Sequence, residues 1–268
     1  GVVTGELGMS FAGAMACTST SGPGLSLKSE AIGLAVMTEL PLVIVDVQRG
    51  GPSTGLPTKT EQSDLTQALF GRNGEAPCIV VAASSSANCF YWAFEAARLS
   101  LETMTPTILL TDGYLGNGSQ LFRIPKMADL PKINPPFATP NDPNYAPYNR
   151  DPETLVRQWA LPGMDGLRHR IGGLEKLSGK GSVSTDSANH EQMVKFRKEK
   201  VERVANRIPN QEVEGAESAD LLVVGWGGTE GALRCAVQEL QAEGKSIAFT
   251  QFNYIMPLPK NTEEMLKR

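Results

Sequence analysis

The sequence has few of the side chains that most often bind transition metals. It contains two histidines and four cysteines, and the cysteines are scattered along the chain as Cys17, Cys78, Cys89 and Cys235. No two cysteines form a Cys-x-x-Cys pair, and none stands at a metal-ligand spacing from a histidine. We therefore expect no metal site and no iron–sulfur cluster bound by this chain alone. The same scatter favours small, buried, apolar cysteines in a reduced, cytoplasmic protein.

Long apolar runs and a strong net charge are also absent. No apolar segment approaches the roughly 18–20 residues that span a membrane, and no basic stripe occurs in a chain whose net charge is -4. We therefore expect neither a membrane nor a nucleic acid as a partner. The apolar fraction of 41% and the charged fraction of 20% are typical of a globular protein, and 268 residues suffice for one large or two ordinary domains.

The common nucleotide, hydrolase and protease motifs are missing. The sequence contains no G-x-x-x-x-G-K-S/T, no G-x-S-x-G and no H-E-x-x-H, which excludes a P-loop ATPase, an α/β-hydrolase and a zincin. The turn at 225–229 (GWGGT) resembles a dinucleotide-binding loop, but that fingerprint requires a glycine at the position of Glu230. A structural turn between a strand and a helix is the simpler interpretation.

Short apolar runs alternate with helical patterns in the first half of the chain. The runs predict strands at 14–20, 42–47, 77–82 and 106–110, separated by helices that end near residues 39, 70 and 101. Repeated strand–helix–strand units of this length predict an α/β fold with a doubly wound parallel sheet. We assign residues 1–125 to this domain.

The second half predicts a connector and then a smaller α/β domain. Prolines crowd residues 126–163, which is typical of an extended surface segment rather than a packed element. A charged helix at 190–207 follows, and we assign 126–215 to the connector and this helix. The helix is expected to direct its charges into solvent and these side chains inward: Met193, Phe196, Val201 and Val204.

The last part of the chain, 216–268, begins a second α/β unit. Strands are predicted at 221–224 and 246–250, and a helix at 230–242 lies between them. The pair Glu263 and Glu264 is interpreted as helix surface.

Two loops rich in Gly, Pro, Ser and Thr follow predicted strands. They are residues 18–24 (TSTSGPG) and 49–55 (RGGPSTG). The carboxyl ends of parallel strands meet at one edge of a sheet, where ligands bind in open α/β folds. Arg49 carries a permanent positive charge on a planar donor fork, which suits a carboxylate or a phosphate. Either loop alone is equally consistent with a plain turn and a surface arginine, but together they favour a ligand-binding cleft.

Longer stretches around these loops resemble a known family. The stretches are Thr20-Ser21-Gly22-Pro23-Gly24, residues 37–59 (MTELPLVIVDVQRGGPSTGLPTK), Leu110-Thr111-Asp112 with Leu115, residues 169–175 (HRIGGLE) and Gly225-Trp226-Gly227. They are similar to the α subunit of 2-oxoacid:ferredoxin oxidoreductases, and most of all to the 2-oxoglutarate branch. The resemblance spans nearly the whole chain, and the string VQRGGPSTGLPT is highly specific.

The resemblance implies a thiamine-diphosphate enzyme that is active only with a partner subunit. Residues 1–125 would form the pyrimidine-binding domain, and 216–268 the start of a transketolase C-terminal-like domain. A β subunit would hold the diphosphate, Mg²⁺ and an iron–sulfur cluster, so the cofactor would be shared and not bound by this chain alone. The implied reaction is oxidative decarboxylation of a 2-oxo acid, with the acyl group passing to coenzyme A and the electrons to ferredoxin.

The resemblance also assigns site residues. It gives Arg49 the role of binding a substrate carboxylate, and Thr58 that of fixing the distal end of the substrate. It places the cofactor beside Thr20, Ser21, Gly22, Pro23, Gly24, Gly50 and Gly51.

Two family features are not found in the sequence. The family's Tyr-Pro-Ile-Thr-Pro-Ser-like segment and its cofactor-activating glutamate belong upstream of Gly1, and the chain is also expected to continue beyond Arg268. Glu6 lies too close to the Phe11-Ala12-Gly13 match to be that glutamate.

Two other classes of function stay open. One is a thiamine-dependent decarboxylase or synthase without electron transfer, in which VQRGGPSTG is not expected. The other is a non-catalytic α/β scaffold subunit, against which the intact glycines beside Arg49 argue. The substrate expected first is 2-oxoglutarate, with pyruvate or a branched 2-oxo acid behind it.

Overall fold

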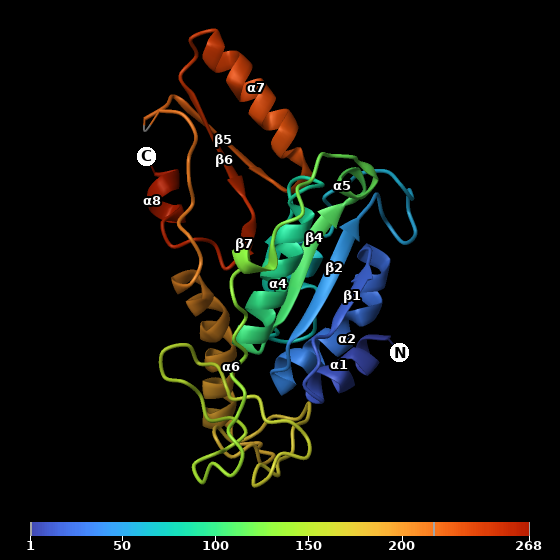
Figure 1. The fold of residues 1–268 in the computed structure, drawn as a ribbon, viewed down its shortest axis with the longest axis vertical. Helices are drawn as coiled ribbons and strands as arrows, with labels where there is room; N and C mark the ends of the chain where they lie inside the picture. Colours follow the sequence, from blue (N-terminus) through green and yellow to red (C-terminus); the bar gives the residue numbers. More distant parts are fainter. Residues whose placement is uncertain (1, 217, 268) are drawn as a thin grey trace.

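The computed structural model describes residues 2–216 and 218–267, and within them two β-sheets are found (Figure 1). The large sheet has the strand order β1-β2-β4-β3-β7, and the small sheet pairs β5 with β6. Neighbouring strands among the first four are parallel, whereas β7 runs antiparallel to β3. The strands are β1 Cys17–Thr20, β2 Leu42–Gln48, β3 Ile79–Ala82, β4 Pro106–Asp112, β5 Leu221–Trp226, β6 Ile247–Phe252 and β7 Tyr254–Met256.

The composition of β2 and β4 explains their position inside the large sheet. Both are short apolar runs, and β4 is buried along its whole length. β-branched and leucine side chains of this kind suit a strand that is covered on both faces. The predicted α/β class with a mostly parallel sheet is confirmed.

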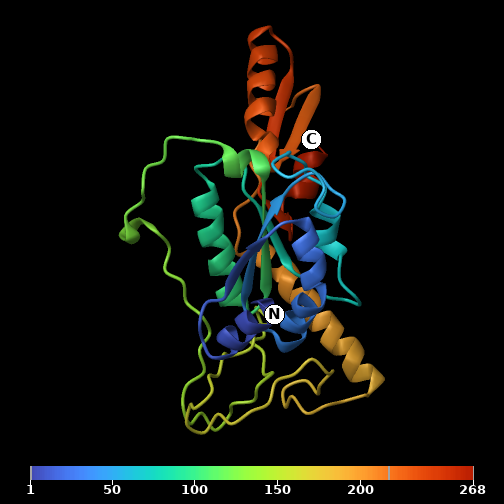
Figure 2. The same ribbon diagram turned by 90° about the vertical axis from the view of Figure 1, so that its right-hand side faces the viewer.

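Helices cover both faces of the large sheet. Ile44 packs in one core with Leu7 of α1 and Ile32 of α2, while the adjacent Val43 packs in a second core with Leu99 of α4. Successive side chains of a strand point to opposite faces, so α1 and α2 lie on one side and α4 on the other, as Figure 2 shows. The helices are α1 Val2–Phe11, α2 Gly22–Thr38, α3 Leu65–Phe70, α4 Cys89–Thr103, α5 Gly113–Asn117, α6 Ser187–Glu202, α7 Glu230–Ala242 and α8 Thr262–Leu266, with short 3₁₀ turns η1 Met127–Asp129, η2 Arg203–Asn206 and η3 Gly227–Thr229.

The connector between α5 and α6 has no α-helix or strand among its residues, but it is packed. Tyr148, Arg157 and Trp159 are each 1% exposed. Arg157 donates hydrogen bonds to the carbonyl oxygens of Thr38 and Glu39, at 3.2 Å each, and so binds the C-terminal end of α2. These carbonyls have no partner within the helix and attract cations. The prediction of an unpacked surface segment was therefore wrong for the part that contains Tyr148, Arg157 and Trp159, although residues 126–129 are exposed as predicted. Arg157 binds residues more than a hundred positions away, and Trp159 stacks on Phe137 of the same segment.

The charges of α6 also differ from the prediction. Met193 and Val201 face inward as predicted, and Val204 in η2 does so too. Arg197 and Lys200, however, are each only 3% exposed, so the polar side chains of this helix are not all solvated. Both cations are buried because each meets a carboxylate, Arg197 that of Glu175 and Lys200 that of Glu39.

The cysteines are less buried than expected. Cys78 is buried and Cys89 is half-buried, but Cys17 and Cys235 are exposed, and all four are free thiols. Cys17 belongs to β1, which lies at the edge of the large sheet and has a neighbouring strand on one side alone in the described structure. No group of three or more acidic, histidine or cysteine side chains with the arrangement of a metal site occurs within residues 2–216 and 218–267. In the same residues, no helix is long and apolar enough to cross a bilayer.

The last part of the chain contributes to both sheets. The helix α7 has the predicted bounds and packs against β5 and β6 in the small sheet. The chain then enters β7, which pairs with β3 in the large sheet. The division into 1–125, 126–215 and 216–268 stays a prediction.

Candidate ligand-binding cleft

A cleft of about 720 Å³ opens between the first turn of α2, the loop after β2 and the segment that leads into α3. Because β1 and β2 are parallel and both end here, the cleft lies at the sheet edge where α/β folds bind ligands. Its lining residues are Gly22, Pro23, Ser26, Leu27, Arg49, Gly51, Pro52, Ser53, Glu61, Ser63, Asp64 and Gln67.

The cleft unites part of the predicted site. Gly22, Pro23, Arg49 and Gly51 line it, whereas the other predicted site residues do not. Those others are Thr20, Ser21, Gly24, Gly50 and Thr58. The structure thus brings both glycine-rich loops to one cavity, as their places after two parallel strands indicate.

The first loop forms the start of a helix. Thr20 is the last residue of β1, Ser21 is in the N-cap position of α2, and a proline occupies the first turn. Gly24 packs directly on Thr20, since a Cβ atom added at Gly24 would lie 1.8 Å from Thr20 Oγ1. The backbone of this segment is therefore fixed closely against the end of β1.

The second loop folds back on itself. The Gly50 amide donates to the Lys59 carbonyl at 3.0 Å, and the Leu56 amide donates to the Gly50 carbonyl at 2.8 Å. Gly55 closes the loop with a φ of 49°, and a Cβ there would lie 1.8 Å from the Gly50 oxygen. Thr58, with a φ of 69°, is exposed in the returning arm of this loop.

Arg49 is the cation of the cleft. It is half-buried, and its side chain makes no hydrogen bond or ion pair with the described residues. Its Nε atom is shielded from solvent without a partner. Since the guanidinium is always charged, Arg49 can bind an anionic ligand that presents two acceptor atoms in one plane. The nearby Glu61 does not bind it but accepts a hydrogen bond from the Gly51 amide at 2.9 Å.

Two carboxyl groups lie under the cleft wall and were not predicted as site residues. Asp46 is fully buried, and Asp64, which lines the cleft, is 8% exposed. Burial raises the pKa of Asp46 to about 7, with the charge and the hydrogen bond of Asp64 adding to the effect. Burial also raises the pKa of Asp64, against its hydrogen bonds with Asp46 and the Gly22 amide. The sequence signal was a single acid, Asp46, within the apolar run of β2; its partner has no such signal.

The side chain of Gln48 connects the elements that carry Asp46 and Asp64. Its Oε1 accepts a hydrogen bond from the Asp64 amide at 3.2 Å, and its Nε2 donates to the Thr111 carbonyl at 3.1 Å. The side chain thus joins β2, β4 and the residue before α3. Gln48 is 1% exposed, so water does not reach its side-chain amide, and loss of these hydrogen bonds would lower the stability of the fold.

The glycine-rich turn of the small sheet packs against the same edge. Gln62 Nε2 donates to the Trp226 carbonyl at 2.9 Å, and a Cβ at Gly228 would lie 2.3 Å from Asp112 Oδ2. Asp112 itself caps α5 by accepting from the Tyr114 and Leu115 amides. These close contacts explain the glycines of this turn by packing.

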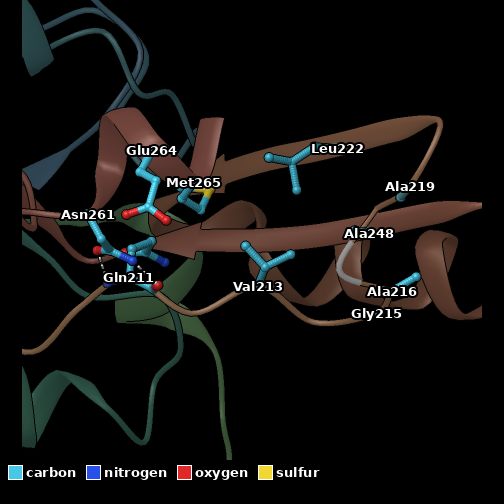
Figure 3. A pocket seen from close by; sticks show the side chains of 10 residues that line it. All are labelled: Gln211, Val213, Gly215, Ala216, Ala219, Leu222, Ala248, Asn261, Glu264 and Met265. Atoms are coloured by element: carbon cyan, nitrogen blue, oxygen red, sulfur yellow. Dashed lines mark hydrogen bonds between the residues drawn. The ribbon is translucent and has the colours of Figure 1, made fainter. Parts of the chain in front are cut away.

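A second hollow, of about 260 Å³, lies on the small sheet (Figure 3). Its lining includes the apolar side chains of Val213, Leu222 and Met265. Gln211 and Asn261 bond to one another there, the Gln211 amide to Asn261 Oδ1 at 2.8 Å and Asn261 Nδ2 to the Gln211 carbonyl at 2.9 Å. These amides are satisfied within the chain, so we assign no ligand to this hollow.

Comparison with known proteins identifies the class. Residues 1–186 match the family described as pyruvate flavodoxin/ferredoxin oxidoreductase, thiamine diphosphate-binding. The match covers more than half of the chain, so the chain belongs to this family and contains its thiamine diphosphate-binding domain.

Two of the relatives are named as subunits of 2-oxoglutarate enzymes. The chain is 50% identical over 269 residues to the 2-oxoglutarate oxidoreductase subunit KorA of Mycobacterium tuberculosis, covering 100% of this chain and 41% of that protein. It is 31% identical to the 2-oxoglutarate synthase subunit KorA of Methanothermobacter marburgensis, covering 97% of this chain and 68% of that protein. The chain therefore spans less than half of the first relative and about two thirds of the second.

A solved structure agrees in fold. The chain superposes with a TM-score of 0.93, at 38% identity, on the 2-oxoglutarate:ferredoxin oxidoreductase from Magnetococcus marinus with 2-oxoglutarate, coenzyme A and succinyl-CoA bound. The match covers 98% of this chain and 46% of that one. The predicted resemblance to 2-oxoacid:ferredoxin oxidoreductases is thereby confirmed.

Proposed function

We propose that this chain is part of the α subunit of a 2-oxoacid:ferredoxin oxidoreductase that acts on 2-oxoglutarate. The observation that carries the proposal is Arg49, a cation without a partner in the described structure, in a cleft between two glycine-rich loops. The matched relatives named as 2-oxoglutarate oxidoreductase and synthase subunits support the choice of substrate.

The cleft fits part of a thiamine diphosphate molecule. Gly22, Pro23 and Leu27 give it an uncharged wall beside the cation of Arg49, and the carboxyl groups of Glu61 and Asp64 line its other side. This arrangement suits a flat ring that carries an anionic reactant. When bound, thiamine diphosphate supplies the nucleophilic carbon and the electron sink for decarboxylation of a 2-oxo acid. We assign its surroundings on this chain to the predicted residues Thr20, Ser21, Gly22, Pro23, Gly24, Gly50 and Gly51.

The chain's own residues bind and orient the substrate. The guanidinium of Arg49 would hold a carboxylate of the 2-oxo acid through two parallel hydrogen bonds, which fixes the plane of that group. Thr58, from the returning arm of the same loop, would fix the distal end. The Glu61 carboxylate, by accepting from the Gly51 amide at 2.9 Å, holds the loop so that Arg49 stays over the cleft.

The complete enzyme extends beyond this chain. We assign the diphosphate, Mg²⁺ and iron–sulfur cluster to a β subunit, the electrons to ferredoxin and the acyl group to coenzyme A, all in the cytoplasm. Residues 1–125 would be the pyrimidine-binding domain, 126–215 the connector with its helix, and 216–268 the start of the transketolase C-terminal-like domain.

The test uses the full-length subunit expressed with its partner and assayed without oxygen. Reduction of a viologen dye is followed with thiamine diphosphate, Mg²⁺ and either 2-oxoglutarate or pyruvate, with and without coenzyme A. Reduction that needs coenzyme A and prefers 2-oxoglutarate is the expected result. Release of CO₂ without dye reduction would instead support a decarboxylase, and failure to bind the cofactor would leave a scaffold subunit.

A further inference from the structure

The two carboxyl groups of Asp46 and Asp64 form a pair with too few donors for two charges. Both carboxylate oxygens of Asp46 and the Oδ2 of Asp64 are buried, and none of the three receives a hydrogen bond from a described N–H or O–H group. Asp64 lies beside Asp46, because its amide donates at 3.2 Å to Gln48, whose side chain is on the same face of β2 as that of Asp46. Each carboxyl group in turn shifts the pKa of the other. Two ionised carboxylates in contact repel one another, and this buried site has no donors that could stabilise both charges. If the two groups share a single proton, the protonated carboxyl group donates a hydrogen bond to the ionised one.

The surroundings do not supply enough positive charge to replace that proton. Lys28 of α2 is the cation that acts on Asp46, and its effect is smaller than those of burial and of Asp64. On the strands beside β2, the register partners of Asp46 are the uncharged Thr20 and Leu110. The segment before α3 adds a negative charge, that of Glu61, which acts on Asp64.

The pair is connected directly to the cleft. Asp64 lines the cleft together with Arg49. Its carboxyl group also supports the first turn of α2, because a Cβ at Gly22 would lie 2.5 Å from Asp64 Oδ1. A change of charge at the pair therefore acts on the wall that faces the ligand, and a change of its geometry acts on the start of α2.

We propose that Asp46 and Asp64 hold one proton between them at neutral pH and that this proton keeps the cleft suited to an anion at Arg49. With the proton in place, the pair carries one negative charge and Asp64 is fixed by a hydrogen bond. When the proton leaves to solvent, the pair carries two negative charges, which oppose a carboxylate at Arg49 and release Asp64 from Asp46. Both residues are positioning residues that act through Arg49 and α2.

The direction of the pH dependence follows from the location of the proton. The pKa of Asp46 is raised from its ordinary value of 3.8 to about 7. The folded protein thus binds more protons than the unfolded chain between these values, so the pair stabilises the fold below pH 3.8 and this contribution is lost as the pH rises to about 7. Binding of an anion at Arg49 is expected to weaken as the pH rises through about 7, where the pair loses its proton.

The experiment uses the full-length protein with its partner subunit and the variants Asp46→Asn and Asp64→Asn. Each asparagine keeps the shape of the carboxyl group and supplies a permanent N–H donor to the remaining carboxylate, as the proton does. Infrared difference spectra across neutral pH are expected to show the C=O stretch of a protonated carboxyl group in the wild type and not in either variant. Asp220→Asn, at an exposed carboxylate just before β5, is the matched control and is expected to keep the wild-type band.

The effect on the cleft is measured as the KM for 2-oxoglutarate, and this part rests on the proposed function. From about pH 6.5 to about pH 8.5, KM is expected to rise roughly tenfold in the wild type and in Asp220→Asn, but less than about twofold in Asp46→Asn and Asp64→Asn. A missing infrared band in the wild type, or a band retained in both asparagine variants, would overturn the shared proton. The same steep KM profile in wild type and both variants would overturn its role in the cleft. An enzyme that does not turn over 2-oxoglutarate refutes the proposed function alone, since the shared proton is still tested by the infrared band. It is also tested by urea unfolding of the wild type and both variants, in which the loss of stability between about pH 4 and about pH 7 is expected in the wild type alone.

Discussion

Lys200 and Glu39 form a buried ion pair, with Lys200 Nζ 2.7 Å from Glu39 Oε2 and side chains that are 3% and 1% exposed. Glu39 is the residue after α2, and it also binds the guanidinium of Arg150 from the connector. One carboxylate therefore joins the end of α2 to two segments more than a hundred residues away. This cluster lies at the opposite end of α2 from the cleft and fixes the helix whose first turn forms the cleft wall.

The first prediction concerns this cluster. Glu39→Gln leaves two buried cations without a carboxylate and is expected to lower the free energy of unfolding by about 3–5 kcal/mol. Lys195→Met on the exposed side of α6 removes a surface pair with Glu191 and is expected to cost less than about 1 kcal/mol. Urea unfolding of both variants measures the difference. Equal effects would mean that the buried pair contributes no more than an exposed one.

The cluster also shows where sequence interpretation fails. The strands β2 and β4 were predicted from β-branched apolar runs, since such runs carry their own local signal. The partners of Glu39 were not predicted as buried, because a proline-rich segment and a charged helix have the sequence patterns of exposed elements. Their burial depends on a carboxylate that is far away in the sequence. Asp64 was missed for the same reason, as its partner Asp46 lies on a different element. The place of Arg49 in the cleft could be predicted because two loop motifs and a strand end converge on it, while its role as a binding residue stays a prediction.

The second prediction tests Arg49 as the carboxylate-binding residue. Arg49→Ala is expected to lower kcat/KM for the 2-oxo acid by about 30–1000-fold, which corresponds to about 2–4 kcal/mol. Arg49→Lys is expected to recover part of this loss, because it restores the charge without the planar fork. Neither change is expected to lower the unfolding temperature measurably, since the side chain makes no bond with the described residues.

The control for Arg49 is Arg123→Ala, which removes an exposed arginine outside the cleft. Its kcat/KM is expected to stay within about twofold of the wild type. A loss of less than threefold in Arg49→Ala, on the scale of about 0.7 kcal/mol, would refute the assignment.

The third prediction concerns the loop that presents Arg49. Gly55→Ala introduces a Cβ at a φ of 49° and 1.8 Å from the Gly50 oxygen, so the loop cannot keep its shape. We expect KM for the 2-oxo acid to rise by about tenfold or more, as misplacement of a binding group does. Gly74→Ala separates the effect of backbone strain from that of the steric clash, because Gly74 has a φ of 65° with nothing within 4 Å of an added Cβ. It is expected to cost about 1–2 kcal/mol in stability through backbone strain alone, with KM unchanged.

The fourth prediction concerns acid stability and the carboxylate of Glu175. Burial raises the pKa of this group, but the hydrogen bonds from Arg197 and His190 outweigh burial and lower it from 4.5 to about 2. The unfolded chain thus binds more protons than the folded protein between these values. The stabilisation is present above pH 4.5 and is lost as the pH falls to about 2. Because the side chain is partly open to solvent, we expect a contribution of about 1 kcal/mol.

Glu175→Gln removes this titration, so the unfolding free energy of the variant should fall less steeply on acidification than that of the wild type. The matched control is Glu202→Gln, which removes an exposed carboxylate at the end of the same helix α6 and should leave the wild-type slope nearly unchanged. Urea unfolding at a series of pH values gives both slopes. If Glu175→Gln keeps the wild-type slope, the two bonds to Arg197 and His190 do not stabilise the ionised form. The hydrogen bonds of Asn189 with the backbone of Lys176 and Ser178 then remain to join the connector to α6.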